Sequence, residues 1–350
     1  MAASAVLNGA RTSSRIAPHT RARILEAATL LSYRPNAAAR ALANRRMNTL
    51  GVATVFTGRE LNHYFLEILN GILEAASALE QNTTVFTLHD WGRDPARLHS
   101  MCDGRIDGLI LIAPKLTAQA AKLLPVHTPF VTVHANHTLP NVLNIETDEE
   151  RGAQELVRHL IAQGHRRIMH VAGDEEVIGA RRRIRGYKQA LAEARIPFQA
   201  DLLVKASFGA GEGRSALRGW LRTHVGRPLP QAIFAGNDGA AVGCMEALAE
   251  VGLRVPDDIS VVGFDDSLVA RTAVPQLTTV RQPLSVMGRR AVEELLSRIG
   301  LENGGAAAPG PAPVIFPVDL VSRASVAAPP AEVRMVPPPR CPEAVSGGGR

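Results

Sequence analysis

The sequence predicts an α/β protein made of two similar units, each a parallel sheet covered by helices, behind a small, basic, all-helical head. Continuous apolar runs alternate with amphipathic helical patterns, and the alternation restarts near Thr147, as is typical of parallel sheets covered on both faces. The charges are also divided. Residues 1–49 hold eight of the 39 basic residues and one of the 33 acidic residues. The other 301 residues hold 31 basic and 32 acidic residues. A basic head on a near-neutral body follows from this division.

The first unit is predicted from five short apolar runs, each the length of a buried strand. We expect helices where apolar residues recur at helical spacing between these runs. The predicted strands are residues 50–55, 85–88, 108–112, 130–133 and 142–145, and the predicted helices lie around 65–73, 96–101 and 118–124.

The second unit repeats the pattern after a junction near Thr147. The glycine-rich run 209–213 lacks the context of a phosphate-binding loop and is interpreted as an ordinary loop. Two facing units of this kind predict a ligand cleft at the carboxyl ends of their strands. Strands are predicted at 168–172, 202–204, 232–235 and 259–264, and helices near 153–163 and 186–194.

The arginine-rich head indicates a polyanionic partner, with nucleic acid as the first candidate and a solvated basic arm as the alternative. Thr20 can cap a helix whose apolar face holds Ile24, Leu25, Ala28 and Leu31. A second, alanine-rich helix is predicted at residues 37–43. About seven residues is too short for a stable isolated helix, so this segment is expected to fold against a partner.

The remaining segments carry few signals. Residues 327–350 are rich in Pro, Ala and Gly and are predicted to be disordered, and 304–313 are interpreted as a linker. Three distant cysteines without a CxxC pair argue against a metal site. No secretory signal and no apolar run of about 18 residues is found, so we expect a cytoplasmic protein with no membrane partner.

Short, specific strings recur along the chain at residues 4–9, 20–28, 33–42, 62–65, 105–110, 164–168, 183–187, 236–238, 252–260, 263–266 and 277–283. Together these strings resemble the lactose-repressor (LacI/GalR) family of bacterial transcription regulators. They follow the family order from about Ser4 to Ser325.

The resemblance implies a helix-turn-helix head, a hinge helix and a core of the periplasmic-binding-protein-like type I fold, with two Rossmann-like subdomains. The chain then crosses between subdomains three times: near Thr147, near 275–279 and in the linker 304–313, after which a strand at 314–321 completes the second subdomain. The expected boundaries are 1–34 for the partial head, 35–49 for the hinge, 50–326 for the core (50–147 with 279–303, and 148–278 with 312–326) and 327–350 for the tail.

The head departs from the family pattern. The family's first helix and the first turn of its recognition helix have no counterpart, and Ala5 stands where many members carry a base-contacting arginine. Either Met1 is an internal methionine of a longer protein, or the regulator is truncated. The intact head sequence after Met1 favours the first explanation. The 350-residue chain as given is expected to bind an operator poorly.

The resemblance also implies DNA contacts in the head and hinge. Leu42 matches a leucine that wedges into the minor groove at the operator centre. The alternative is that it packs the hinge helix against the head, but the flanking Pro35, Asn36 and Arg40 favour the wedge. The arginines are candidates for phosphate contacts. The full DNA-binding set is Ser4, Asn8, Arg21, Arg23, Arg34, Asn36, Arg40 and Leu42.

For the cleft, Arg183, Asn237 and Asp265 match family effector contacts, and such a set can hold ligand hydroxyls through charge-assisted hydrogen bonds. Phe65 and Phe208 are either stacking faces or core aromatics. Asp148 either lines the cleft or caps the next helix. The full effector-binding set is Tyr64, Phe65, Asp148, Arg183, Phe208, Asn237 and Asp265.

The resulting hypothesis is a homodimeric, effector-responsive regulator, most simply a repressor, that binds a palindromic operator. It needs no cofactor or metal, takes a small, sugar-like effector, and is cytoplasmic and nucleoid-associated. No GxGxxG or GxSxG motif is present, which argues against an enzyme. The alternative is a solute-binding protein on the same core that does not bind DNA.

Overall fold

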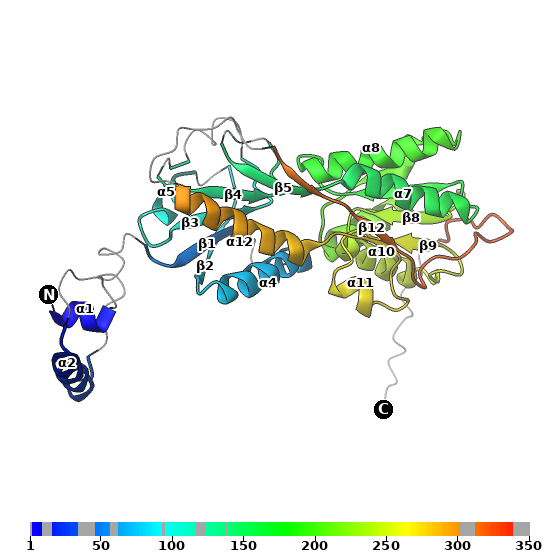
Figure 1. Ribbon diagram of the computed structural model, residues 1–350. Coiled ribbons are helices and arrows are strands. Elements are labelled where there is room, and N and C mark those ends of the chain that lie inside the picture. The colour runs from blue at the N-terminus through cyan, green and yellow to red at the C-terminus, as the bar shows by residue number, and fades with distance from the viewer. Residues whose placement is uncertain are drawn as a thin grey trace, which may run out of the picture.

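The computed structural model describes residues 2–8, 16–33, 46–56, 62–92, 95–116, 124–125, 127–137, 139, 141–301 and 312–338, with the backbone alone at 4, 8, 95, 96, 300 and 301. Two α/β lobes lie end to end, and two head helices lie beyond the N-terminal lobe (Figure 1). Among the described residues, no helix has the length and apolar character needed to cross a membrane.

The N-terminal lobe, here called the N-subdomain, is built on a six-stranded parallel sheet of order β11-β5-β4-β3-β1-β2. Buried apolar side chains on both faces make the central strands β1, β3 and β4 continuous apolar runs, whereas the edge strand β2 is largely exposed. The strands are β1 (Thr49–Val55), β2 (Asn82–Leu88), β3 (Gly108–Ile112), β4 (Phe130–Val133), β5 (Leu143–Thr147) and β11 (Val314–Phe316).

One face of this sheet is covered by α4 (His63–Ala78) and α12 (Leu284–Leu301), and the other by α5 (Pro95–Met101). Two glycines let α4 and α12 approach closely. A Cβ at Gly71 would lie 1.9 Å from the Ser285 carbonyl oxygen, and one at Gly288 would lie 2.2 Å from that of Ile68. Side chains larger than hydrogen are therefore excluded at both positions.

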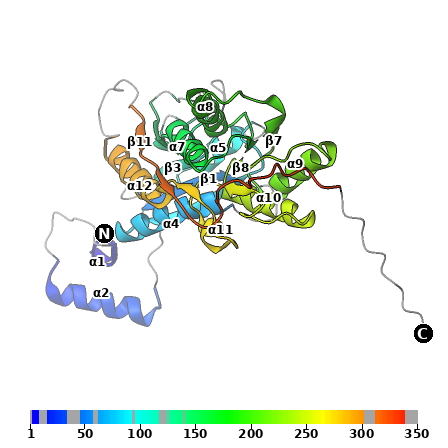
Figure 2. The same cartoon turned by 90° about the vertical axis from the view of Figure 1, so that its right-hand side faces the viewer.

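The C-subdomain contains a four-stranded parallel sheet of order β7-β6-β8-β9. Helices α7 and α8 pack on one face, and α9 and α10 on the other (Figure 2). A short antiparallel pair, β10 with β12, lies beside β9. The elements are α7 (Glu149–Ala162), β6 (Ile168–Ala172), α8 (Ile178–Glu193), the 3-10 turn η1 (Ala200–Leu202), β7 (Leu203–Lys205), α9 (Ala210–Thr223), β8 (Ala232–Ala235), α10 (Asp238–Glu250), β9 (Ser260–Val262), α11 (Leu268–Thr272), β10 (Thr279–Arg281) and β12 (Asp319–Val321).

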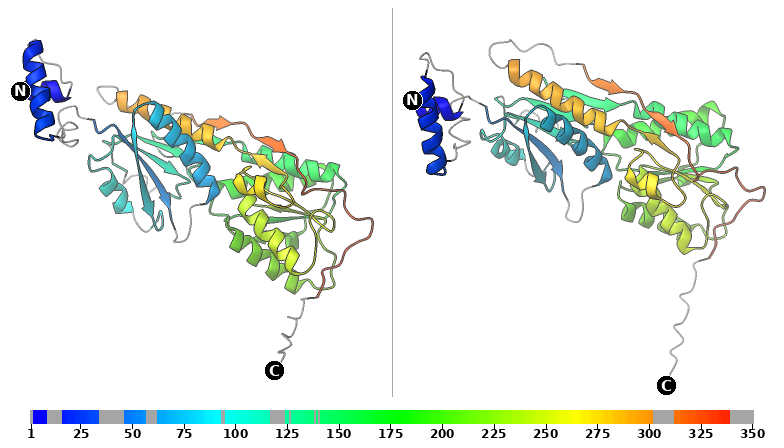
Figure 3. Two further views of the ribbon diagram at one scale, coloured as in Figure 1. Left: turned by 90° about the horizontal axis from the view of Figure 1, so that it is seen from below. Right: turned by 60° about the horizontal axis from the view of Figure 1, so that its bottom comes forward.

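The chain crosses between the subdomains three times, and two crossings differ from the sequence prediction. The first follows Thr147, as predicted. The second follows β10 and not residues 275–279, because parallel bridges from Thr278 and Arg281 hold β10 beside β9. The third separates β11 from β12, so residues 314–321 are two strands in different lobes and not one (Figure 3). Pro317 lies between them and supplies no N–H to a strand ladder.

The predicted disorder from residue 327 is wrong for residues 327–338. Val336 is buried in the core formed by α9 and α10. Its N–H donates to the Arg227 carbonyl at 2.9 Å, and Gly226 N–H donates to the Val336 carbonyl at 3.0 Å. Arg334 also pairs with Asp258 at 3.0 Å. Residues 327–338, here called the strap, form an irregular segment that packs against the core. Such a segment has no repeating pattern of apolar residues, so the sequence does not reveal it. Residues 339–350 lie outside the described part.

The glycine-rich run 209–213, interpreted as a loop, instead begins α9. Its glycines permit close helix packing, since a Cβ at Gly213 would lie 2.5 Å from the Ala240 carbonyl oxygen of α10. The predicted helix at 118–124 and the predicted hinge helix at 37–43 fall on residues that the structure does not describe, apart from Leu124.

Candidate effector cleft and DNA-binding head

We place the candidate effector cleft where the two subdomains meet, at residues that follow the carboxyl ends of strands or lie in the first two turns of the next helices. Tyr64 lies in the first turn of α4, Arg183 in the second turn of α8, Asn237 is the N-cap of α10, and Asp265 follows β9. A parallel sheet places all such positions at one edge, which is the usual location of a ligand site.

Arg183 is the most heavily bonded of these residues. Its Nη2 donates to Glu149 Oε1 at 2.9 Å and its Nη1 donates to the Gly236 carbonyl at 2.5 Å. Its guanidinium lies 4.0 Å from the centre of the Phe264 ring and 5.8 Å from that of Phe208. A guanidinium held between a carboxylate and an aromatic face is fixed in orientation before any ligand binds.

Asp265 lies 3.8 Å from Arg183 and accepts a 2.7 Å hydrogen bond from Gln282 Nε2. Its φ of 121° is rare for a residue with a side chain, and strained backbone of this kind often occurs at functional sites. Burial raises the pKa of Asp265 to about 6. Burial, with the nearby Asp265 charge, also raises the pKa of Asp238 to about 8, although Thr279 and Ser267 donate to it.

A chain of hydrogen bonds joins the two subdomains through the crossing strands. Tyr64 Oη bonds His134 Nδ1 at 2.5 Å, His134 Nε2 bonds Thr147 Oγ1 at 3.1 Å, and Thr147 donates to Gln282 Oε1 at 2.6 Å. Because the single proton of Thr147 goes to Gln282, His134 Nε2 donates and its Nδ1 accepts from Tyr64. Every donor therefore points toward the Asp265 carboxylate. We call these five residues the hinge relay.

Charged residues of the C-subdomain change the pKa of Tyr64 in the N-subdomain. Burial raises the pKa of Tyr64 well above its usual value, the negative charges of Glu149 and Asp265 raise it further, and Arg183 opposes them. Burial also lowers the pKa of His134. Both groups are therefore neutral near pH 7, which is the state that the hinge relay requires.

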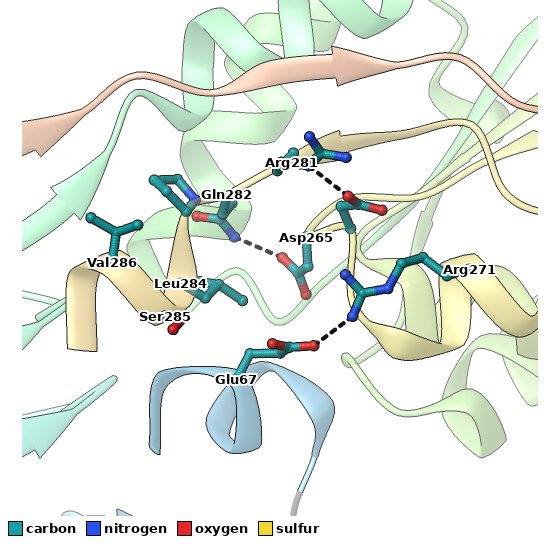
Figure 4. Close-up of a pocket in the computed structure, with 10 residues that line it drawn as sticks. Glu67, Asp265, Arg271, Arg281, Gln282, Leu284, Ser285 and Val286 are labelled. Atoms are coloured by element: carbon teal, nitrogen blue, oxygen red, sulfur yellow. Dashed lines mark hydrogen bonds and ion pairs between the residues drawn. The ribbon is translucent and has the colours of Figure 1, made fainter. Parts of the chain in front are cut away.

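Other contacts hold the subdomains together at the cleft. Arg271 of α11 pairs with Glu67 of α4 at 2.9 Å beside a cavity of about 130 Å³ that also contacts Asp265 and Gln282 (Figure 4). In addition, Ile178 N–H of the C-subdomain donates to Asn136 Oδ1 of the N-subdomain at 2.7 Å. The subdomains are thus in direct contact at more than one point.

Some predicted effector residues have other duties. Phe65 is buried in the N-subdomain core, which favours the core interpretation of this residue over the stacking interpretation. Asp148 is exposed and caps α7 by accepting from Arg151 N–H, as its alternative stated. Asn237 caps α10 through Ala240 N–H and also bonds Asp265. Phe208 is half-buried next to Arg183.

The structure adds cleft residues that the sequence did not single out. Glu149 follows Asp148 directly, and Gln282 lies in a string that was used only for the family resemblance, so both had a weak signal. His134 had none and Thr147 was singled out only as the first crossing, because their hydrogen bonds depend on segments that meet only in the fold. In the described part of the chain, no three His, Cys, Asp or Glu side chains cluster so as to hold a metal.

The head contributes two described helices, α1 (Ala2–Asn8) and α2 (Pro18–Leu30). The N-cap of α2 is Ala17 and not the predicted Thr20, because Pro18 occupies the first helical position, which its fixed φ suits. Arg21 and Arg23 are exposed on α2. The side chains of the other DNA-binding candidates lie outside the described residues; these are Ser4, Asn8, Arg34, Asn36, Arg40 and Leu42.

Comparison with known families and curated proteins agrees with this architecture. A periplasmic binding protein-like domain family matches residues 157–326. The ribose operon repressor of Haemophilus influenzae is 32% identical over 85% of this chain and 87% of its own length. The transcriptional repressor PurR of Aliivibrio fischeri is 30% identical over 81% and 84%. Both relatives are transcriptional repressors rather than enzymes.

Solved structures give the same result. The lac repressor dimer bound to operator is 29% identical, with a TM-score of 0.78 over 93% of this chain and 94% of that one. The regulator CelR in complex with cellobiose is 27% identical, with a TM-score of 0.71 over 92% and 94%. The similarity extends over head and core together.

Proposed function

The chain belongs to the LacI family of bacterial transcription regulators, and from this premise we propose that it is an effector-responsive repressor that binds a palindromic operator as a homodimer. A two-fold symmetric dimer presents two heads to two half-sites, which is why such operators are palindromic. The protein is not an enzyme and acts in the cytoplasm, at the nucleoid.

The observation that carries this proposal is the convergence of Tyr64, Arg183 and Asp265 from two subdomains on one cleft. A ligand that hydrogen-bonds to groups on both sides favours one relative orientation of the lobes over another. The N-subdomain carries the hinge and head, so a change of orientation alters the spacing of the two heads. Phe208 supplies an aromatic face and Asn237 a further amide for a sugar-like effector.

On the DNA side, we propose phosphate contacts for the exposed Arg21 and Arg23 and for the arginines at 34 and 40. Leu42 is assigned to the minor groove, and Ser4, Asn8 and Asn36 to polar contacts. Phosphate contacts release counterions, so the logarithm of affinity should fall linearly with the logarithm of salt concentration.

The test is selection of binding sites from a random duplex library by the purified full chain, followed by a salt titration of the selected duplex. We expect a two-fold symmetric consensus and a steep salt dependence. A chain that enriches no sequence and shows a flat salt response is a solute-binding protein and not a regulator.

A further inference from the structure

The buried charges of the cleft are unequal in number. Three carboxylates, Glu146, Glu149 and Asp265, face two guanidiniums, Arg182 and Arg183. All five side chains are buried or nearly so. This cluster of five side chains therefore carries a net negative charge before any ligand enters.

The terminal nitrogens of both guanidiniums already face acceptors of the protein. Arg183 is bound by Glu149 and the Gly236 carbonyl, with Asp265 beside it. Arg182 donates to Glu146 at 3.0 Å and lies 3.5 Å from Glu149. A carboxylate or phosphate ligand normally binds an arginine through two parallel N–H donors. Here Glu149 and the Gly236 carbonyl already accept from the two terminal nitrogens of Arg183, and Glu146 and Glu149 lie against those of Arg182.

Glu149 is built into the site by its neighbours. It occupies the first helical position of α7, where the helix dipole favours a negative charge. A Cβ at Gly179 of α8 would lie 2.3 Å from Glu149 Oε1, so α8 leaves room for this carboxylate at its own N-terminal turn. Fixed in this way, Glu149 cannot readily move aside for a competing anion.

Two buried polar atoms beside these ion pairs still lack a hydrogen-bond partner among the described residues. One is a donor, Arg183 Nε, and the other an acceptor, Glu149 Oε2. A hydroxyl group both donates and accepts, so hydroxyls can match both kinds of atom. An anionic group accepts only and would face Glu149 unfavourably.

Resting on the proposed function, we propose that the effector is an uncharged polyhydroxyl compound, and that Glu149 determines this specificity by neutralising Arg183. Sugar acids and sugar phosphates are excluded from the cleft. Arg183 then serves as a rigid hydrogen-bond donor and not as an anion receptor.

The experiment measures binding of matched ligand pairs to the full chain by calorimetry at pH 7.5. The neutral members are ribose, glucose, galactose and cellobiose. The charged members are ribonate, glucuronate, galacturonate, cellobionate and ribose 5-phosphate. We expect at least one neutral sugar to bind and its charged counterpart to bind at least about tenfold more weakly. A charged member that binds more tightly than its neutral partner overturns the proposal, and so does the absence of binding by every neutral sugar.

The variant Glu149→Gln tests the assigned residue, and its thermal unfolding shows whether it is folded. We expect the ratio of charged-ligand to neutral-ligand affinity to rise at least about tenfold, because the variant no longer neutralises Arg183. An unchanged ratio in folded Glu149→Gln assigns the selectivity elsewhere and contradicts the role of Glu149. These outcomes are independent of the duplex selection, which is done without ligand. A regulator with an acidic effector would select a symmetric duplex but would bind the charged ligand more tightly in calorimetry. A chain that is not a regulator would select no duplex, whichever sugar it binds.

Discussion

Replacing Thr147 by valine removes the centre of the hinge relay without changing the shape of the side chain. Thr147 is 1% exposed, donates to Gln282 at 2.6 Å and accepts from His134 at 3.1 Å. It is also the last residue of β5, where the chain first leaves the N-subdomain. The variant therefore leaves two buried polar groups without a hydrogen-bond partner at the point where the lobes are joined.

The expected loss in the free energy of unfolding follows from the two groups that lose their partner. His134 and Gln282 are both buried, and a buried group that loses its partner costs about 1–3 kcal/mol. Small shifts of the two side chains recover part of this cost, so Thr147→Val should lower the free energy of unfolding by about 2–4 kcal/mol. Thr147→Ser keeps the hydroxyl and loses only a methyl group, worth about 1 kcal/mol.

The assay is urea unfolding at pH 7.5, followed by circular dichroism, with the wild-type protein, Thr147→Val and Thr147→Ser measured together. The expected order of stability is wild type, then serine, then valine. A valine variant as stable as the serine variant would show that the hydroxyl of Thr147 contributes nothing. The hinge relay would then be a set of neighbouring atoms without energetic coupling.

Four further predictions follow from the same structure. Asp265→Asn should weaken binding of the cleft ligand at least about tenfold while circular dichroism stays native, because a hydrogen bond to a charged group exceeds one to a neutral group; an unchanged calorimetric Kd contradicts this. Gly71→Ala should lower the free energy of unfolding by about 1–3 kcal/mol through overpacking against α12, whereas Gly219→Ala, with open space at its Cβ, should not destabilise in the same urea series. Asp238 has a pKa of about 8 in the folded protein, so it keeps its proton at pH values where the unfolded chain has lost it. The free energy of unfolding should therefore fall between pH 7 and 8, and Asp238→Asn should reduce this pH dependence. The same pH dependence in both proteins refutes the assignment. Leu42→Ala should weaken binding of the selected operator more than binding of random duplex in anisotropy titrations, and equal losses exclude a wedge.

The strands were the most predictable part of the fold. Residues 108–112, 130–133, 168–172 and 232–235 were predicted with the bounds that the structure shows, because each is a continuous apolar run between polar or turn residues. The third crossing was misplaced, since Pro317 divides a run that looks uniform in hydropathy. The strap was missed because an irregular segment is held by individual hydrogen bonds and has no repeating pattern.

The site was predictable only where the family resemblance supplied residues. Arg183 and Asp265 lie 3.8 Å apart, which agrees with the resemblance that placed both in one site. Phe65 could not be separated from Tyr64 in the sequence, although the helix turns one into the core and the other toward the hinge relay. An arginine in a cleft is most simply expected to bind an anionic ligand, but Arg183 is already paired with Glu149. This pairing depends on a contact between α7 and α8 that only the fold provides.

The central claim is that occupancy of the cleft controls the affinity of the head for DNA. The most direct measurement is the anisotropy of a labelled duplex, selected by the full chain from a random library, titrated with and without a saturating neutral sugar that binds the cleft. The account predicts that the sugar changes the duplex Kd at least about tenfold in the wild type and leaves it unchanged in Asp265→Asn. The same duplex Kd with and without the sugar in the wild-type protein contradicts it.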